Sequence, residues 1–400
     1  MSWETVTLDK LGNVSRGRSK HRPRNDPSLF GGKYPFIQTA DVKAAPFYIT
    51  EFNETYNEKG LAQSKLWHQG TLCITIAANI ADTAILGLDA CFPDSVMGFI
   101  PYDKVSDVRF VKYAFDMLQR DMKQISQGTA QDNLSWQKLS TIEFPKPPFE
   151  VQRKIADYLV AFEDLIENNQ KQIKLLEEAA QRLYKEWFVD LRFPGHETTP
   201  IIDGVPEGWK KDRADSFFDI TIGKTPPRAE SHWFTSGDKG IPWLSISDMG
   251  NAGVYSFVAS EGLSEEAVTK HNMKVVPAGT IFVSFKLTVG RVSIATGKMC
   301  TNEAIAHFRV DDSLRYYTFL YLKAFEYDKL GNTSAISKAV NSKIIKAMPF
   351  IMPDRETMNC FSMVVAPIFK EIYAKQKQTL SLIEARDRLL PKLMSGEIEV

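Results

Sequence analysis

The sequence predicts an α+β protein made of two tandem copies of one unit, each a mixed or mostly β domain followed by a long helix. Two observations predict this class: similar stretches recur in the same order, and a heptad-like apolar stripe follows each domain. A third is size, because 400 residues exceed the roughly 250 over which a single core usually grows. We expect domains over 1–150 and 200–352, and helices over 151–190 and 353–395.

Three pairs of similar stretches reveal the repeat. They are 32–42 (GKYPFIQTADV) with 239–249 (KGIPWLSISDM), 69–86 with 278–295, and 168–183 with 374–389. The shifts are 207, 209 and 206 positions, so both the order and the spacing are kept. Chance rarely produces three matches at nearly one offset, and we therefore interpret the chain as two copies of one unit.

The longest apolar run of the first domain, 71–88, is predicted to form two buried strands. Asn79 and Asp82 interrupt the run, and a turn is expected between its halves. A membrane span needs about 20 consecutive apolar residues, so this interrupted run does not predict one.

Prolines mark where each domain passes into its helix. Pro145, Pro147 and Pro148 precede the first helix, and Pro353 precedes the second. Proline cannot continue a strand ladder and disfavours a helical conformation in the residue before it. We therefore expect each helix to begin just after these positions.

The two helices carry apolar stripes that predict their pairing. In the first helix, the positions reached from Ile155 to Trp187 by alternating steps of four and three are all apolar except Asn169. Those expected to pair are Ile155, Leu159, Phe162, Ile166, Ile173, Leu176 and Leu183. In the second helix the stripe is weaker, because Lys375 and Thr379 interrupt it, and its pairing positions are Phe361, Val365, Ile368, Ile372, Leu382 and Leu389. One such stripe alone would fit a helix lying on its own domain, whereas two similar helices bury their stripes most simply against each other. Asn169, a polar residue within the first stripe, would then fix the register at some cost in stability.

Composition excludes a global attraction to nucleic acid or membrane, because 49 basic residues balance 49 acidic ones. Any nucleic-acid surface must therefore be local. Cys73, Cys91, Cys300 and Cys360 show no C-x-x-C pairing, which suits buried thiols in a reducing cytosol and argues against structural zinc. The N-terminal residues lack the basic start and apolar stretch of a signal peptide, so we expect a cytoplasmic protein.

No motif for catalysis is recognisable. Pro-Pro-Phe at 147–149 resembles the [DNS]-P-P-[FY] loop of amino-methyltransferases, but Lys146 stands where that loop needs an acceptor, and lysine offers only donors. Gly-Lys-Thr at 223–225 has Phe218 in place of the first glycine of a phosphate loop. Dinucleotide-binding, zinc-protease and nuclease motifs are absent too, so we expect no catalytic residue, metal or cofactor in this chain.

Two basic loops are the candidate binding sites. The first contains Arg16, Arg18, Lys20, Arg22 and Arg24, and the second contains Lys224, Thr225 and Arg228. Lysine and arginine neutralise phosphates, and arginine also binds guanine in the major groove. Small polar groups suited to base edges follow each loop: Gln38, Thr39 and Asp41, then Ser245, Ser247 and Asp248. A solvated loop is the alternative for the first basic run, and turn formation is the alternative for the small polar residues.

With these features the chain resembles the specificity subunit of type I DNA restriction-modification systems. The resemblance rests on the domain openings, on the stretches 127–159 and 331–353, and on the closing RDRLLPKLMSGEIEV. Its most specific string is G-T-A-Q-x-N-L-S…P-P-x-x-x-Q-x-x-I over 128–155. The second copy departs from it, since Met358 and Cys360 replace the Q-x-x-I pair.

The resemblance implies a non-catalytic reader of double-stranded DNA. It implies two target recognition domains, each reading half of a split site, and helices that pair antiparallel. It also implies two partner methyltransferase subunits that carry S-adenosylmethionine, and translocase-nuclease subunits where restriction occurs. A helix over 151–187 would be roughly 55 Å long, which corresponds to up to about 16 base pairs of DNA.

Two other functions fit the same residues. The first is a scaffold whose paired domains bind protein ligands, which binding to heparin or DNA would test. The second is a nucleic-acid enzyme with an unrecognised site, which methylation or cleavage by the chain alone would reveal.

Overall fold

Strands and short helices build two units that have separate sheets and separate apolar cores. A computed structural model describes residues 3–76, 82–125, 136–330 and 340–400. Unit 1 comprises Met1–Asn168 with Thr379–Val400, and unit 2 comprises Asn169–Gln378. The division falls within both long helices, so each helix contributes residues to both units.

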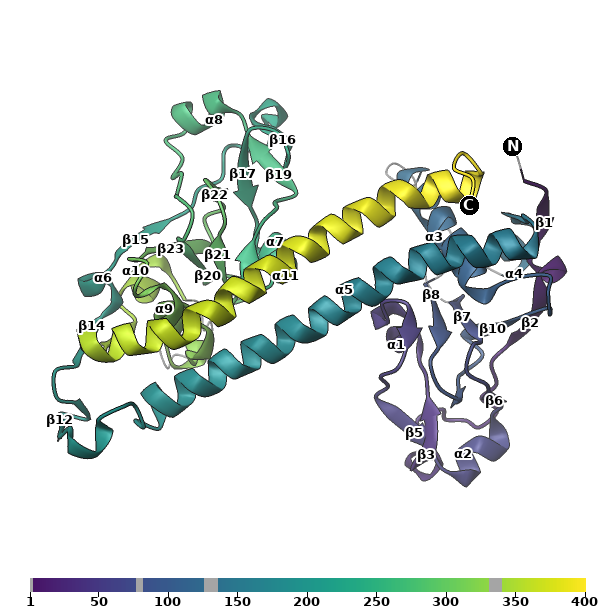
Figure 1. Ribbon diagram of the computed structural model, residues 1–400, viewed down its shortest axis with the longest axis horizontal. Helices are drawn as coiled ribbons and strands as arrows, with labels where there is room; N and C mark the ends of the chain where they lie inside the picture. The colour runs from purple at the N-terminus through teal and green to yellow at the C-terminus, as the bar shows by residue number, and fades with distance from the viewer. Residues whose placement is uncertain (1–2, 77–81, 126–135, 331–339) are drawn as a thin grey trace. The chain divides into compact units, whose positions relative to one another are not determined.

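Unit 1 is built on a five-stranded sheet with the strand order β2-β10-β7-β8-β4 (Figure 1). Neighbouring strands are antiparallel except β4 and β8, which are parallel. The strands are β2 (Gly12–Arg16), β10 (Val96–Pro101), β7 (Leu72–Thr75), β8 (Thr83–Leu86) and β4 (Tyr48–Ile49). Every residue of β7 and β8 is buried. The two buried strands predicted within 71–88 are therefore confirmed, and the residues 77–81 of the expected turn lie outside the described part of the chain.

Smaller sheets and short helices complete unit 1. A four-stranded sheet has the order β5-β3-β9-β6, and β1 pairs with β11. These strands are β5 (Glu54–Tyr56), β3 (Phe30–Phe36), β9 (Ala90–Cys91), β6 (Leu66–Trp67), β1 (Thr5–Thr7) and β11 (Glu143–Pro145). The short helices are α1 (Thr39–Ala44), α2 (Glu58–Gln63) and α4 (Trp136–Leu139), and α3 (Val108–Ile125) is an 18-residue helix.

Unit 2 repeats the five-stranded sheet strand for strand and the four-stranded sheet in part. Its five-stranded sheet has the order β15-β23-β20-β21-β18, its four-stranded sheet β16-β19-β17-β22, and β14 pairs with β24. The strands of the large sheet are β15 (Asp219–Ile222), β23 (Ile305–Arg309), β20 (Ile281–Ser284), β21 (Val292–Ala295) and β18 (Tyr255–Ser256). The other strands are β16 (Phe234–Ser236), β19 (Glu261–Leu263), β17 (Ile241–Leu244), β22 (Cys300–Thr301), β14 (Lys210–Arg213) and β24 (Pro349–Met352). The predicted internal repeat is confirmed.

Short helices and one extra hairpin complete unit 2. The helices are α6 (Ala214–Phe217), α7 (Ile246–Asn251), α8 (Glu265–Lys270), α9 (Arg315–Ala324) and α10 (Ser342–Lys346). A hairpin of β12 (Ile201–Ile202) and β13 (Val205–Pro206) precedes them. Two strands of the four-stranded sheet differ between the units. β3 is a single bulged strand, whereas its counterpart is split into β16 and β17. The counterpart of β6 is only an isolated bridge between Val276 and Met299.

The long helices α5 (Phe149–Tyr184) and α11 (Arg355–Ser395) pair in opposite directions, as predicted. In unit 1, Ile155 and Leu159 from the start of α5 share a core with Leu390 and Leu393 from the end of α11. In unit 2, residues from the end of α5 and from the start of α11 likewise share one core. Of the predicted pairing positions, Ile155, Leu159, Ile166, Phe361, Val365 and Ile372 are buried, while Phe162, Ile173, Leu176, Leu183, Ile368, Leu382 and Leu389 are half-buried.

Asn169, the polar residue of the first stripe, is buried and donates a hydrogen bond from Nδ2 to Oε1 of Gln378 at 3.1 Å. Both residues belong to unit 2, so the polar position is matched by an amide on the partner helix. No described helix is both long enough and apolar enough to cross a membrane.

The two helices begin with different anchors. In unit 1, Gln152 is buried, donates from Nε2 to the carbonyl oxygens of Val105 and Pro147, and accepts from the Asp107 N–H. In unit 2, Asp354 precedes α11 and accepts from the backbone N–H groups of Glu356 and Thr357, the Thr357 hydroxyl and the Trp209 indole. The glutamine of the resemblance string therefore ties helix to domain. The parts of the two quoted stretches within 126–135 and 331–339 lie outside the described residues.

Candidate nucleic-acid interface

Loops gather at one edge of the five-stranded sheet in unit 2, which we call loop edge 2. Because the neighbouring strands are antiparallel, β15 and β20 end at this edge while β23 and β21 begin there. The edge therefore brings together the loop 223–228, the turn 285–291 and the segment 302–304. Two backbone hydrogen bonds join these stretches, since the N–H of Gly223 donates to Ile305 O and the N–H of Phe285 donates to Ala304 O.

The start of α7 belongs to the same edge. The Asn302 N–H donates to Leu244 O at 3.1 Å, which places the segment 302–304 beside the residues that open α7. Arg291, at the end of the turn, donates from Nη1 to Ile246 O at 2.5 Å. Loop edge 2 thus includes the predicted serines Ser245 and Ser247.

Unit 1 has the same edge, loop edge 1, held by equivalent bonds. The Gly17 N–H donates to Val96 O at 2.8 Å, as Gly223 does to Ile305. The Arg18 N–H donates to Phe92 O at 3.0 Å, and its counterpart is the bond from the Lys224 N–H to Thr301 O at 2.9 Å. The predicted correspondence of the two basic loops is therefore confirmed.

The backbone of the first basic loop is attached to the domain beneath it. The Ser64 hydroxyl donates to Arg18 O at 2.7 Å, and the Lys20 N–H donates to Gln63 O at 3.4 Å. The His21 N–H donates to the side-chain oxygen of Gln63 at 3.0 Å. The backbone of the loop is therefore held by the domain, while a solvated loop, the alternative considered from sequence, stays open for its exposed side chains.

The five cations of this loop fall into two groups. Arg16, Arg18 and Lys20 are exposed, and no carboxylate among the described residues lies within ion-pair distance of them. Arg22 and Arg24 instead face Asp94, with nitrogen to oxygen distances of 3.8 and 2.5 Å. The first group is available to an external anion such as a phosphate. The second group is already paired with the carboxylate of Asp94.

Loop edge 2 uses its cations differently. Arg228 makes a bidentate pair with Glu261 at 2.8 and 2.9 Å, and its guanidinium lies over the rings of Phe234 and Trp243 at 4.2 and 4.6 Å. This arginine is therefore fixed and neutralised within its own unit. Lys224 is exposed and has no ion-pair partner in the described part of the chain.

The predicted Thr225 donates a hydrogen bond to the Glu303 carboxylate. This bond lowers the pKa of Glu303, and the nearby cations Lys286 and Arg228 lower it further. Lys286, in the turn 285–291, is exposed and was missed by sequence reasoning. The repeat offered a signal for it, because the similar stretches 69–86 and 278–295 span this turn.

The two predicted aspartates hold the openings of α1 and α7. Asp41 is buried and accepts from the Gln38 N–H and from Nδ2 of Asn53, both at 2.8 Å, while Nε2 of Gln38 donates to Glu54 at 2.7 Å. Turn formation, the alternative considered from sequence, accounts for Oδ2 of Asp41, and the contact with Asn53 occupies Oδ1.

Asp248 has a similar place in unit 2. Its carboxylate accepts from the N–H and hydroxyl of Ser245 and from the N–H and hydroxyl of Ser260. Burial raises the pKa of Asp248, but these hydrogen bonds outweigh burial and the pKa is lowered. Thr39 and Ser247 lie in the first turns of α1 and α7, and Ser247 is exposed.

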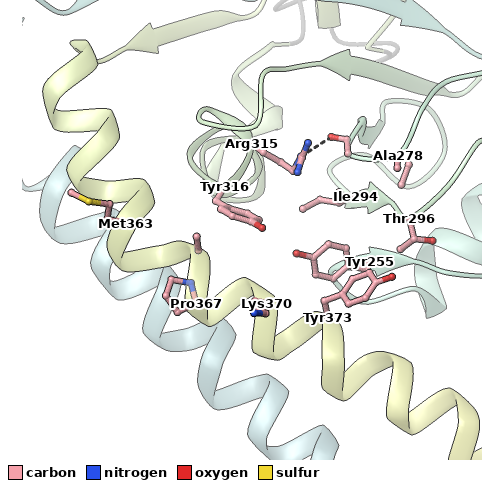
Figure 2. A pocket seen from close by; sticks show the side chains of 13 residues that line it. Tyr255, Ala278, Ile294, Thr296, Arg315, Tyr316, Met363, Pro367, Lys370 and Tyr373 are labelled. Carbon is pink, nitrogen blue, oxygen red and sulfur yellow. Dashed lines mark hydrogen bonds between the residues drawn. The ribbon is translucent and has the colours of Figure 1, made fainter.

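A separate hollow of about 690 Å³ lies at the opposite edge of the sheet of unit 2, next to α9 and α11 (Figure 2). Its wall includes the rings of Tyr255, Tyr316 and Tyr373. Arg315 also lines it, but its guanidinium donates to Gly279 O and pairs with Asp312. The hollow shares no residue with loop edge 2.

The described residues contain no cluster of histidine, cysteine or carboxylate groups that would hold a metal ion. Cys73, Cys91 and Cys300 are buried, and burial raises the pKa of Cys300 to about 12. Such thiols are poor nucleophiles. What the two loop edges offer is exposed cationic and hydroxyl side chains on a fixed backbone, which suits binding of phosphates and base edges.

Comparison with known proteins finds one family model and several similar proteins of the same kind. The family model described as "Type I restriction modification DNA specificity domain" matches residues 1–178 and 206–393. The MjaIX specificity subunit of a type I restriction enzyme from Methanocaldococcus jannaschii is 28% identical over 419 residues, covering 100% of this chain and 94% of that protein. The HindI specificity subunit from Haemophilus influenzae is 25% identical over 332 residues, covering 66% of this chain and 71% of that protein.

The fold is also similar to a solved structure. The crystal structure of the S subunit of a type I restriction-modification system from M. genitalium matches with a TM-score of 0.59 and 14% sequence identity. The match covers 98% of this chain and 96% of that one.

Proposed function

Because the chain belongs to the family of type I restriction modification DNA specificity domains, we propose that it reads a split DNA site, one half with each loop edge. DNA recognition is the role of this family, and the chain is a recognition component rather than a catalytic subunit. The proposal concerns how the reading is divided and what the chain assembles with.

The proposal rests on one observation. The two units hold their loop edges with equivalent backbone hydrogen bonds but place different side chains on them. The bonds from Gly17 to Val96 and from Gly223 to Ile305 hold the two edges alike. The exposed side chains on them differ, so the two edges would select different bases. We assign phosphate contacts to the unpaired cations, which are Arg16, Arg18 and Lys20 on loop edge 1 and Lys224 and Lys286 on loop edge 2.

Polar side chains near these cations would supply base contacts. Gln38, Thr39 and Ser247 remain candidates, since each lies at the opening of α1 or α7. Before Arg22, Arg24 or Arg228 could contact DNA, each would have to break its ion pair with Asp94 or Glu261.

We further propose that two methyltransferase subunits dock on the long helices and supply both S-adenosylmethionine and the methylation chemistry. Exposed apolar side chains on the helices support this, since leaving large apolar groups in water is unfavourable. The most exposed are Tyr158, Leu165 and Leu175 on α5 and Met363 and Val364 on α11, with 49 to 71% of each exposed. Nuclease subunits would complete a restriction complex.

The length of the paired helices is proposed to set the gap between the half-sites. Removing one heptad from each helix, residues 166–172 and 377–383, deletes Asn169 and Gln378 together and keeps the stripes in phase. The helices would shorten by about 10 Å, so the gap should shrink by about 3 base pairs while both half-sites stay unchanged. Sequencing of methylated DNA measures the gap. An unaltered gap would refute the proposal that helix length sets it.

The decisive experiment is a genome-wide map of N6-methyladenine in cells that express this chain with its methyltransferase partner. Cells that express the methyltransferase alone are the control. A split motif that appears only with the chain supports the proposal and reveals the target. No methylation, or the same motif in the control, would instead favour a scaffold that binds protein ligands.

A further inference from the structure

The turn between β20 and β21 displays two apolar side chains at loop edge 2, and Leu287 is by far the more exposed of them. Leu287 is 95% exposed, the highest value among the large apolar residues of the described chain, and Val289 beside it is 37% exposed. A single exposed leucine is common on protein surfaces, but burying it against a bound partner would be favourable. What distinguishes Leu287 is its place on loop edge 2, where it is available to whatever this edge binds.

The turn holds Leu287 outward through specific contacts. The Ser284 hydroxyl donates to Thr288 O at 2.5 Å and accepts from the Arg291 N–H at 3.0 Å, while the Gly290 N–H donates to Ser284 O at 2.9 Å. Leu287 has a φ of 60°, in the left-handed region that disfavours side chains with a Cβ. The turn thus keeps an unfavourable backbone conformation at the residue that it exposes.

The surroundings of Leu287 are those of the proposed DNA-binding edge. Its neighbour Lys286 is exposed and lies close enough to Glu303 to lower the pKa of that carboxyl. Glu303 also accepts the hydrogen bond of Thr225, next to the exposed Lys224. The apolar side chain of Leu287 therefore lies on the same edge as two exposed lysines, which can bind phosphates. This combination fits nucleic acid better than an apolar protein surface.

The chemistry of DNA narrows what the leucine would touch. All four base pairs can be distinguished only in the major groove, and there the one apolar group on a base edge is the C5 methyl of thymine. We propose that Leu287 reads this methyl group in the half-site bound by unit 2. The inference rests on the proposed function and adds a residue that determines specificity.

The test uses the complete complex with its methyltransferase partner and DNA duplexes that carry the mapped target. Each thymine of both half-sites is replaced in turn by uracil, which lacks only the C5 methyl. Binding is measured for the wild type, for Leu287→Ala and for Ile202→Ala. Ile202 is a matched control because it is 49% exposed on the β12–β13 hairpin of the same unit.

One uracil substitution should weaken binding by the wild type and by Ile202→Ala about fourfold, the value of one buried methyl. The same substitution should not weaken binding by Leu287→Ala, which has already lost the contact. The inference is overturned if no uracil affects the wild type, or if Leu287→Ala shows the full penalty. A complex that binds no split site at all would instead refute the proposed function.

Discussion

Unit 1 and unit 2 share one topology but hold their long helices with different side chains. The start of α5 is tied down by the neutral amide of Gln152, which meets three backbone groups. The start of α11 is tied down by the carboxylate of Asp354, which meets the indole of Trp209 and the first turn of the helix. The comparison teaches that the repeat preserves where a helix must be anchored, while the chemistry of the anchor is free to change.

The polar contacts between α5 and α11 also differ between the two units. In unit 1, Arg386 of α11 pairs with Glu163 of α5 at 2.9 Å and also contacts Asp387, which in turn pairs with Arg120. In unit 2, a neutral polar contact joins the helices, between Asn169 and Gln378. Half-buried charge thus joins the helices in one unit and an amide pair joins them in the other.

The largest effect is expected at this charged contact. The side chains of Glu163 and Arg386 are only 12 and 21% exposed, and burial raises the pKa of Glu163 although Arg386 opposes the shift. Arg386→Ala would leave a buried carboxylate unpaired and should destabilise unit 1 by about 3 kcal/mol. Asn169→Ala should cost unit 2 only about 1 kcal/mol.

Hydrogen–deuterium exchange of peptides from each half of α5 measures both effects. The double variant Glu163→Leu with Arg386→Met should recover most of the loss, because it leaves no unpaired charge. Equal sensitivity of the two units would remove the distinction between their helix contacts.

The next effect concerns the anchor of α5. Gln152→Ala should destabilise unit 1 by about 2 kcal/mol, because the Asp107 N–H and two carbonyl oxygens lose their partner. Gln152→Met introduces the residue type that Met358 has in unit 2 and restores the volume without the hydrogen bonds. Denaturant unfolding should show similar losses for both variants, and a stable methionine variant would mean that packing alone anchors α5.

The two loop edges should differ in their salt dependence. Replacing Arg16, Arg18 and Lys20 by alanine should make the slope of log K against log salt shallower by about 2.7, since each phosphate contact contributes about 0.9. The double variant of Lys224 and Lys286 should change it by about 1.8. DNA binding titrations at several salt concentrations measure the slopes.

Arg22→Ala with Arg24→Ala is the matched control on loop edge 1, because Asp94 already pairs with both residues. Its slope should change less than that of the triple variant. An equal change would show that these arginines leave Asp94 for phosphate.

The smallest expected effect is a difference in pH dependence between the Asp354 anchor of α11 and the Gln152 anchor of α5. Burial raises the pKa of Asp354, but hydrogen bonds from Thr357, Trp209 and Glu356 outweigh it and the pKa is lowered. The stabilisation is therefore present above the unfolded pKa of about 3.9 and is lost as pH falls through the lower folded value. The loss should be about 1 kcal/mol, the usual value of a helix cap, whereas Gln152 does not titrate.

Hydrogen exchange at the start of α11, compared between pH 5 and pH 3 by using exchange rates corrected for intrinsic pH dependence, measures this loss. Asp354→Asn should abolish the pH difference. A similar acid response at the start of α5 would show that the difference in anchors does not control it.

Much of the fold could be predicted because its signals are local. The repeat, the prolines before Phe149 and Arg355, and the apolar stripes each depend on residues close together in the chain, and the structure confirms the elements they predicted. The two basic loops were found for the same reason. The glutamine of the resemblance string was visible, but its contact with the segment 105–107 was not, because that contact joins residues about 45 positions apart.

The sequence by itself determined that there are two copies of one unit, where their long helices run, and which loops carry positive charge. Only the tertiary structure decided which of those charges remain available. Arg24 meets Asp94 and Arg228 meets Glu261 across 70 and 33 positions, while Arg16, Arg18 and Lys20 meet no carboxylate among the described residues. The physical reason is that periodicity acts between neighbours in the chain, whereas pairing of charges depends on which strands the sheets bring side by side.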